Sequence, residues 1–145
     1  MKRMIRKSIV FILILLTFMG MMTSCKNSIT KDEVDASIVS FFEAVESEDY
    51  ETAAALFHKD QPTEAEGLRE WFESIEEKKN IDFSSGILIE RRTGSKGAAY
   101  DFVRGGAYYE VDLILSIEEA EKVSLYVTLE FIKNDNGFGM YNIHI

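Results

Sequence analysis

Residues 109–131 read YEVDLILSIEEAEKVSLYVTLEF, and this stretch decides the class of the fold. Apolar residues occupy every second position in two runs, from Tyr109 to Ile117 and from Val123 to Phe131. Neighbouring side chains of a strand point to opposite faces, so this alternation predicts two strands with one buried and one solvated face. The side chains expected to face inward are Val111, Leu113, Leu115, Ile117, Val123, Leu125, Val127, Leu129 and Phe131. Strands with one wet face are typical of an antiparallel sheet.

Further strands flank this pair. The Asn134-Asp135-Asn136-Gly137 segment is a strong hairpin signal, and the strand after it would hold Tyr141, Ile143 and Ile145. Upstream, residues 87–89 (ILI) and 100–103 (YDFV) predict two more strands, joined by a hairpin loop at residues 93–97 (TGSKG). The sheet should therefore have four to five strands.

Before residue 80 the apolar residues recur at helical spacing. Thr30 and Glu33 fit a capping box, Asp49 can cap a second and shorter helix, and Thr63 with Glu66 repeats the capping box before a third helix. Residues on the expected apolar stripes are Val34, Ile38, Phe41, Phe42, Val45, Leu68, Trp71, Phe72 and Ile75. Helices followed by hairpin-joined strands predict an α+β domain, with N-terminal helices packed on one face of an antiparallel sheet.

Residues 39–57 (VSFFEAVESEDYETAAALF) add a resemblance to a known family. An amphipathic helix, an acidic turn and a short Ala-rich helix resemble the opening of nuclear transport factor 2-like domains. The resemblance implies a strongly curved sheet that wraps the helices as a cystatin-like cone and leaves a cavity between them. Some members of that superfamily are enzymes, such as ketosteroid isomerases and dehydratases, and others are binding or assembly modules, so the fold does not decide the function.

The first 25 residues have the layout of a bacterial secretory signal. Four basic residues precede an apolar run from Ile9 to Met22, and Met22-Thr23-Ser24-Cys25 follows. This end resembles the lipobox of bacterial lipoproteins, which implies lipid attachment at Cys25. We therefore expect a signal peptide at 1–24, a lipidated cysteine and tether at 25–29, and one α+β domain at 30–145. A plain secretory signal or an uncleaved short anchor is the alternative.

Charge and cysteine content exclude several classes of function. Without residues 1–24 the chain keeps 12 Lys and Arg against 25 Asp and Glu, a formal net charge of −13. Such a domain is repelled by nucleic acid, so we expect no nucleic-acid partner. Cys25 is the single cysteine, which leaves no disulfide and no Cys-based metal site. The isolated His58 and His144 make no metal site either, and we expect no cofactor.

Few residues suggest chemistry inside the predicted cone. The inward positions assigned on the two central strands are aliphatic or Phe, and no carboxylate there could act as a general base. His58 follows the second helix, where a capping or solvent-exposed role is expected. Trp71, Tyr141 and Tyr50 are the candidates for lining a ligand cavity.

The outer face of the sheet is a second candidate site. Tyr126, Tyr108, Ile114, Thr128 and Ile132 fall on outward positions of the two central strands. Such residues are common in strands for their propensity alone. Tyr is also enriched in contact surfaces, and in the resembling superfamily sheet faces often form dimers.

We expect a lipid-anchored extracytoplasmic protein, on the cell membrane or the outer membrane, that acts by binding. Its partner would be a protein or a second copy at the outer face, or a small apolar ligand in the cavity. An enzyme of isomerase or hydrolase type using a cavity Tyr or Asp is one alternative, and a structural envelope component is another. The ligand, the pathway, the oligomeric state and the number of host membranes stay open.

Overall fold

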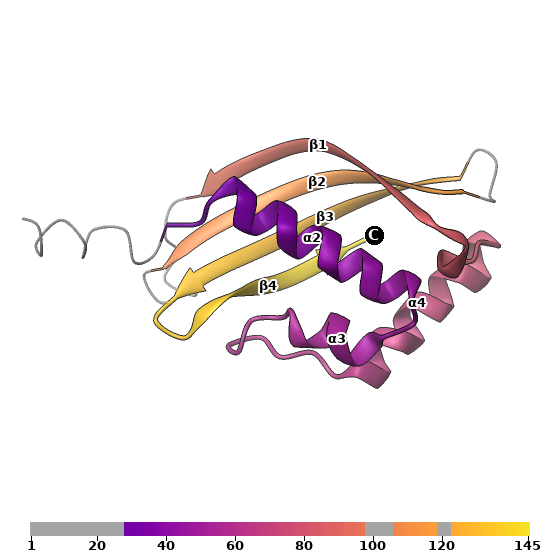
Figure 1. The fold of residues 1–145 in the computed structure, drawn as a ribbon, viewed down its shortest axis with the longest axis horizontal. Helices are drawn as coiled ribbons and strands as arrows, with labels where there is room; N and C mark the ends of the chain where they lie inside the picture. The colour runs from indigo at the N-terminus through magenta and orange to yellow at the C-terminus, as the bar shows by residue number, and fades with distance from the viewer. Residues whose placement is uncertain (1–27, 98–105, 119–122) are drawn as a thin grey trace, which may run out of the picture.

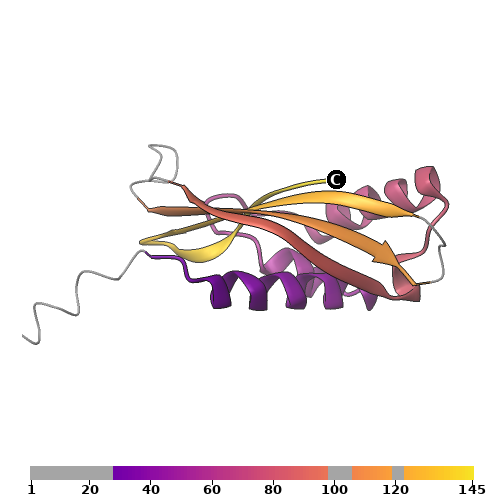
Figure 2. The same cartoon turned by 90° about the horizontal axis from the view of Figure 1, so that it is seen from above.

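Helices cover one face of a four-stranded antiparallel sheet in the computed structural model, which describes residues 28–97, 106–118 and 123–145 (Figure 1). The strands are adjacent in sequence order, β1-β2-β3-β4, and Figure 2 shows the helices on one side of the sheet. The elements are α2 (Lys31–Glu46), α3 (Tyr50–Ala55), α4 (Ala65–Lys79), the 3₁₀ turn η1 (Phe83–Ser85), β1 (Ile87–Gly97), β2 (Ala107–Ile117), β3 (Ser124–Asn134) and β4 (Gly137–His144). The predicted α+β class is confirmed.

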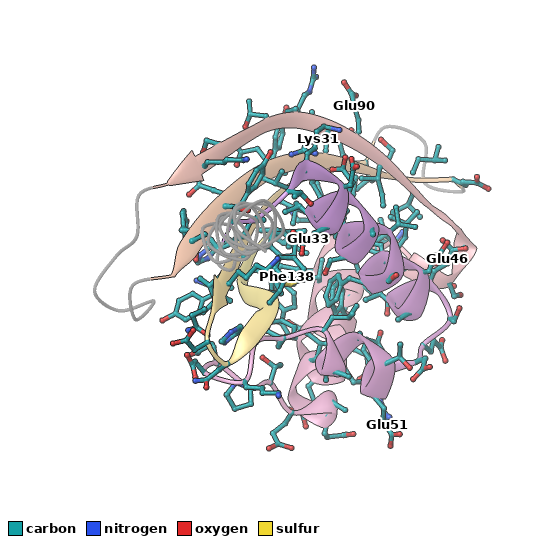
Figure 3. All side chains as sticks on the ribbon, turned by 60° about the vertical axis from the view of Figure 1, so that its left-hand side comes forward. Lys31, Glu33, Glu46, Glu51, Glu90 and Phe138 are labelled. Atoms are coloured by element: carbon teal, nitrogen blue, oxygen red, sulfur yellow. The ribbon has the colours of Figure 1, made fainter. Side chains whose placement is uncertain are left out.

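The two faces of the central strands follow the predicted alternation. Val111 pairs with Leu129 and Leu113 with Val127, and all four side chains are buried on the concave face. Glu90 of β1 projects from the convex face in Figure 3, where the sheet arches over the helices.

The first two helix starts are confirmed and the third is wrong. The Thr30 hydroxyl accepts the amide of Glu33 at 3.2 Å, while the Glu33 carboxylate accepts the amide of Thr30 at 2.9 Å. Asp49 caps α3 by accepting the Thr52 amide at 3.1 Å. Helix α4 has Glu64 at its N-cap without a side-chain bond, because the helix begins one residue too late for Thr63 to cap it.

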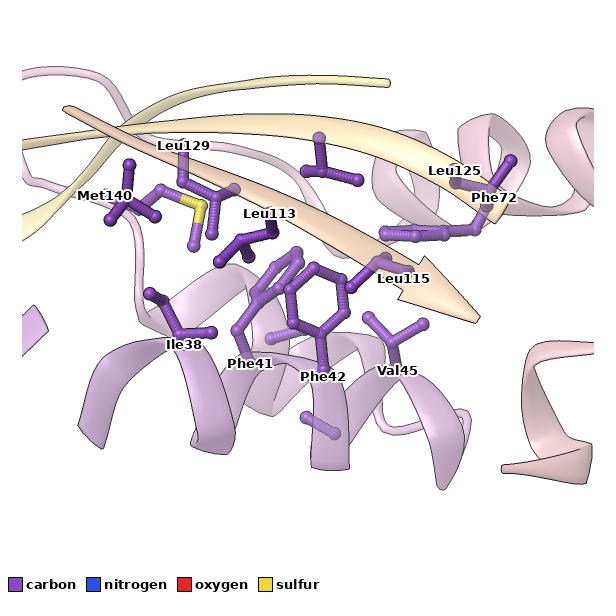
Figure 4. Close-up of a cluster of buried hydrophobic side chains, with 14 of the residues drawn as sticks. Ile38, Phe41, Phe42, Val45, Phe72, Leu113, Leu115, Leu125, Leu129 and Met140 are labelled. Carbon is purple, nitrogen blue, oxygen red and sulfur yellow. The ribbon is translucent and has the colours of Figure 1, made fainter. Parts of the chain in front are cut away.

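Large side chains fill the space between α2 and the sheet. Phe41 and Phe42 of α2 meet Phe72 of α4 and a layer of strand residues that includes Leu113 and Leu129 (Figure 4). The core begins at Ile29, which was assigned to the tether but is buried at the position before the N-cap of α2. With Val34 it occupies the two positions of a hydrophobic staple. The segment 26–145 therefore contains every described core residue and should fold by itself.

Strand β1 is longer than predicted. Residues 93–97, expected to be a hairpin loop, continue the strand and pair with β2, from Thr93 opposite Asp112 to Gly97 opposite Tyr108. A bulge at Arg92 shifts the register, and the added pairing outweighs the turn-forming tendency of the two glycines. The strand expected at 100–103 lies outside the described residues.

The predicted hairpin turn at residues 134–137 is confirmed, and His58 holds it in place. His58 is only 1% exposed, so the expected capping or solvent role is wrong. Its Nε2 lies 3.1 Å from the Gly137 carbonyl oxygen, and its Nδ1 accepts the Asp60 amide at 3.0 Å. The Asp60 carboxylate accepts side-chain amides of Asn134 and Asn136 at 2.8 and 2.7 Å. The loop after α3 thereby fastens the β3–β4 hairpin.

A bulge in β4 changes which side chains face inward. Met140 pairs with Phe131 and Asn142 with Glu130, so Tyr141 is an extra residue. Met140 and Ile143 pack on the main core, whereas Tyr141 packs with Tyr108 and Ile132, which are outward by parity. The predicted inward position of Tyr141 is wrong, because simple alternation does not count a bulged residue.

Candidate functional site

A groove between α4 and β3, called the α4–β3 groove below, forms a hollow on the described part of the molecule. Its volume is about 390 Å³, within the range of small-molecule sites. Helix α4 contributes Trp71, Ile75, Lys78 and Lys79. Strand β3 contributes Ser124, Leu125 and Tyr126, and Ile145 closes the lining.

The helical wall follows from the spacing of its residues. Leu68 and Phe72 are buried and hold α4 on the core. Trp71 and Ile75 are one turn apart on the neighbouring stripe, and Lys78 and Lys79 continue it one turn further. The Trp71 ring stands edge-on to that of Phe72, with ring centroids 5.0 Å apart. The indole is therefore packed against a core residue. One stripe therefore changes from apolar to cationic along the helix.

The strand wall exists because β4 stops short. The β3–β4 ladder ends at the pair Thr128–His144, so residues 124–126 of β3 extend beyond the last β4 pair. In this gap Leu125 is buried, while Tyr126 is 76% exposed. The groove therefore has a buried aliphatic floor, formed by Leu125, and an exposed aromatic rim, formed by Tyr126, where β4 would otherwise continue.

The lysines give the groove its charge. Lys78 and Lys79 are exposed, form no ion pair with another described residue, and share the lining with no Asp or Glu side chain. Other basic side chains differ in this respect: Arg91 is paired with Asp35 of α2, and Lys133 is paired with Glu33 of the same helix. The groove thus presents two cationic groups beside an apolar surface.

Of the three expected cavity residues, the structure places only Trp71 in this groove. Tyr50 is buried between α3 and α4, with its ring centroid 6.1 Å from that of Phe72 and the Arg69 guanidinium 5.9 Å from the ring. Burial and the nearby carboxylate of Glu76 raise the pKa of Tyr50. Tyr141 packs with Tyr108 and Ile132, away from the groove, and is not part of its lining. The expected grouping of these residues in one cavity is therefore wrong.

Of the five expected contact residues, Tyr126 is the one fully exposed. Thr128 is half-buried, and Tyr108, Ile114 and Ile132 are buried although their parity is outward. Tyr108 and Ile132 are a directly opposed pair, and packing of their side chains, with Tyr141, forms a second small cluster. The expected five-residue contact face is thus reduced to Tyr126. Leu88 of β1 is also exposed, but β2 separates its strand from that of Tyr126.

Hydrogen bonds occupy the polar groups at the centre of the outer face. Asp112 accepts the hydroxyls of Thr93 and Thr128 at 2.7 and 2.8 Å, which lowers its pKa. The Tyr108 hydroxyl lies 2.7 Å from a Glu130 carboxylate oxygen and 3.0 Å from one of Glu110. Burial and these carboxylates raise the pKa of Tyr108. The carboxylates of Asp112, Glu110 and Glu130 are therefore hydrogen-bonded to hydroxyl groups of the sheet itself.

Sequence reasoning missed a polar cluster on the inner face. The Arg91 guanidinium contacts the Asp35 carboxylate of α2 and donates to the Tyr109 hydroxyl at 2.7 Å. Gly94 makes room, since a β-carbon there would lie 2.3 Å from Arg91 Nη2. The sequence does contain a signal for this cluster. Arg91 follows Ile87 and Ile89 at every second position, so the strand period places its side chain on the inner face. These groups tie α2 to the edge of the sheet.

The described residues contain neither a cluster of metal ligands nor a membrane-spanning helix. In residues 28–97, 106–118 and 123–145 no group of three or more His, Cys, Asp or Glu could hold a metal ion. Over the same ranges no helix is long and apolar enough to cross a membrane.

Comparison with known proteins gives a similarity of structure only. No protein-family model matches the chain, and no curated protein matches its sequence. Among solved structures, the chain is similar to an NTF2-like protein of unknown function from Pseudomonas putida KT2440. The identity is 12% and the TM-score 0.47, over 79% of this chain and 83% of that one.

Proposed function

We propose that this protein is a membrane-tethered extracytoplasmic lipoprotein whose domain binds a small apolar ligand in the α4–β3 groove. The observation that carries the binding role is the groove itself. It combines an indole, aliphatic side chains and two lysines that form no ion pair with a described residue, in about 390 Å³, whereas the space between α2 and the sheet is filled by side chains. Small-molecule sites are typically concave and apolar with a few polar groups.

The anchor is supported by the sequence before residue 28. Basic residues, an uninterrupted apolar run and Cys25 stand in the order of a lipoprotein signal. The buried Ile29 lies four positions after Cys25, a reach of at most about 14 Å. A lipid on Cys25 would therefore hold the domain close to the membrane. The end of α4 lies at the other end of the molecule from the start of α2, so the groove would face away from the bilayer (Figures 1 and 2).

Replacing Cys25 tests the anchor. The full chain with Cys25→Ala, made in a bacterial host, should leave the membrane fraction or accumulate as uncleaved precursor. The wild-type chain should carry acyl groups at its N-terminal cysteine by mass spectrometry. Identical partitioning of the two proteins, with no lipid on either, contradicts the lipoprotein proposal.

Trp71 supplies a direct test of binding because it is the single tryptophan of the chain. Fluorescence of the 26–145 segment should shift on titration with N-phenyl-1-naphthylamine, a neutral apolar probe. Tyr126→Ala should weaken the response, since it removes one wall at an exposed position. Leu88→Ala, a truncation of another exposed residue on β1, is the matched control. A probe that leaves Trp71 unchanged, or an equal effect of both substitutions, argues against a ligand groove.

An enzymatic role has less support. The titratable side chains lining the groove are Lys78, Lys79 and Tyr126, and no Asp, Glu or His side chain is among them. General acid–base catalysis needs a positioned group with a pKa near the working pH. The binding role therefore accounts for the lining better than an isomerase or hydrolase does.

A further inference from the structure

We propose that the α4–β3 groove selects an anionic amphiphile, a small molecule with an apolar body and a carboxylate, phosphate or sulfate head group. This inference rests on the proposed ligand-binding function and adds the chemical class of the ligand. Two features carry it: the order of residues along α4, and two lysines at its end that form no ion pair within the described part of the chain.

The order of residues sets the shape of the ligand. Trp71 and Lys78 are seven residues apart on α4, which corresponds to roughly 10 Å along the helix axis. The apolar surface of the groove is formed by Trp71, Ile75, Leu125 and Ile145. The ammonium groups of the two lysines lie at the C-terminal end of the helix. An elongated ligand can therefore lay its apolar body on the indole while its head group reaches Lys78 and Lys79.

The local charge favours an anion even though the protein is acidic. The C-terminus of α4 carries a partial charge of about −0.5, which opposes an anion, but two lysines add two full positive charges beside it. Carboxylates elsewhere on the surface are screened beyond about 8 Å at physiological ionic strength. Glu76, on the same helix, directs its carboxylate to the amide of Phe83 at 2.8 Å and does not line the groove. The head group therefore meets two lysines without a competing Asp or Glu side chain in the lining.

A series of ligands with one tail and different heads tests the selection. The 26–145 segment is titrated with decanoate, decyl sulfate, decanol and decyltrimethylammonium, each below its micellar concentration, and Trp71 fluorescence reports occupancy. The two anions should bind about two- to tenfold more tightly than decanol, the range expected for two exposed charge contacts. The cationic ligand should bind most weakly. Added salt should reduce the advantage of the anions.

Charge-neutral variants of the lysines provide the second arm. The double variant Lys78→Gln and Lys79→Gln should bind decanoate about as weakly as decanol while leaving decanol binding unchanged. The control is Lys59→Gln with Lys96→Gln, which removes the same charge from exposed sites outside the groove lining. It should keep the preference for anions. Circular dichroism melts of both double variants check that the fold is intact.

The outcomes separate the two proposals. Equal affinity for decanoate and decanol, or an equal loss of anion preference in both double variants, overturns the selection of anions while leaving a ligand groove in place. A Trp71 signal that no ligand of any charge perturbs removes the groove as a site, and the anion proposal with it. Tight binding of an acidic peptide without binding of decanoate would likewise overturn the small-molecule assignment.

Discussion

Gly139→Ala should destabilise the protein strongly, because β4 passes close to the loop after α3 at this residue. A β-carbon on residue 139 would lie 2.7 Å from the His58 amide nitrogen and 2.8 Å from its Cα, closer than such atoms normally approach. Both are backbone atoms, so no side chain can swing aside to relieve the clash. The φ angle of Gly139 is not in the left-handed region, so the expected effect is steric alone.

The magnitude follows from the contacts that must give way. The His58 amide donates to the Met140 carbonyl at 2.7 Å, and the Met140 amide donates to the Leu56 carbonyl at 2.9 Å. Each bond contributes about 0.5–1.5 kcal/mol, and forcing an extra methyl into a packed site typically costs 1–3 kcal/mol. We expect a loss of roughly 2–4 kcal/mol in the free energy of unfolding. For a domain of this size that lowers Tm by about 8–16 °C.

Gly67→Ala in α4 is the matched control, since it adds the same methyl group where no atom lies within 4 Å. Alanine is the better helix former, so this change should stabilise the 26–145 segment by up to about 1 kcal/mol. Urea titration and thermal melts followed by circular dichroism measure both variants. A Gly139→Ala protein that melts with the wild type would show that the loop and β4 are not in close contact, and the reasoning would fail.

Three other predictions test the core, an ion pair and the exposed face. Leu129→Ala should cost about 2–5 kcal/mol as a fully buried truncation, and Thr128→Ala far less; equal costs in a urea titration would mean that the two faces of β3 are exchanged. The hydrogen bond from Lys133 lowers the pKa of Glu33, so this stabilisation is complete above the unfolded-state pKa near 4.5 and is lost as the pH falls. Lys133→Gln should therefore make Tm fall less steeply as the pH is lowered through the acid range. An unchanged dependence of Tm on pH would contradict the stabilising role of the Lys133–Glu33 contact. Tyr126→Glu should leave the fold intact and abolish any self-association through the outer face, measured by sedimentation over a concentration series; a wild-type segment that is monomeric throughout removes support for that face.

Local signals in the sequence predicted most of the fold. The capping boxes and periodicities before residue 80 depend on neighbours within one or two helical turns, and α2 begins where Thr30 and Glu33 predicted. The alternation in β2 and β3 gave the buried face correctly, because one residue of slip would expose the whole set of apolar side chains. The turn at Asn134–Gly137 was likewise predicted from its own four residues.

The start of α4 was missed by one residue, because Glu64 and not Thr63 is its N-cap. The other errors have a cause that is not local. Residues 93–97 have the composition of a loop, but pairing with β2 makes them strand. Tyr141 and Arg92 are extra residues in bulges, and a bulge depends on the partner strand rather than on the bulged residue. His58 was expected near the surface because no local pattern shows that the β3–β4 turn will close over it.

The candidate site shows the same division. The sequence alone placed Trp71 and Ile75 on the apolar side of the third helix, because side chains four residues apart on a helix lie one above the other. The tertiary structure was needed to show that these two residues and the lysines after them face the uncovered start of β3, that Tyr50 is core, and that Tyr141 packs with Tyr108 and Ile132. Helical and strand periods are properties of consecutive residues. A groove depends instead on where one strand stops beside another element, which is settled only when segments distant in the chain pack together.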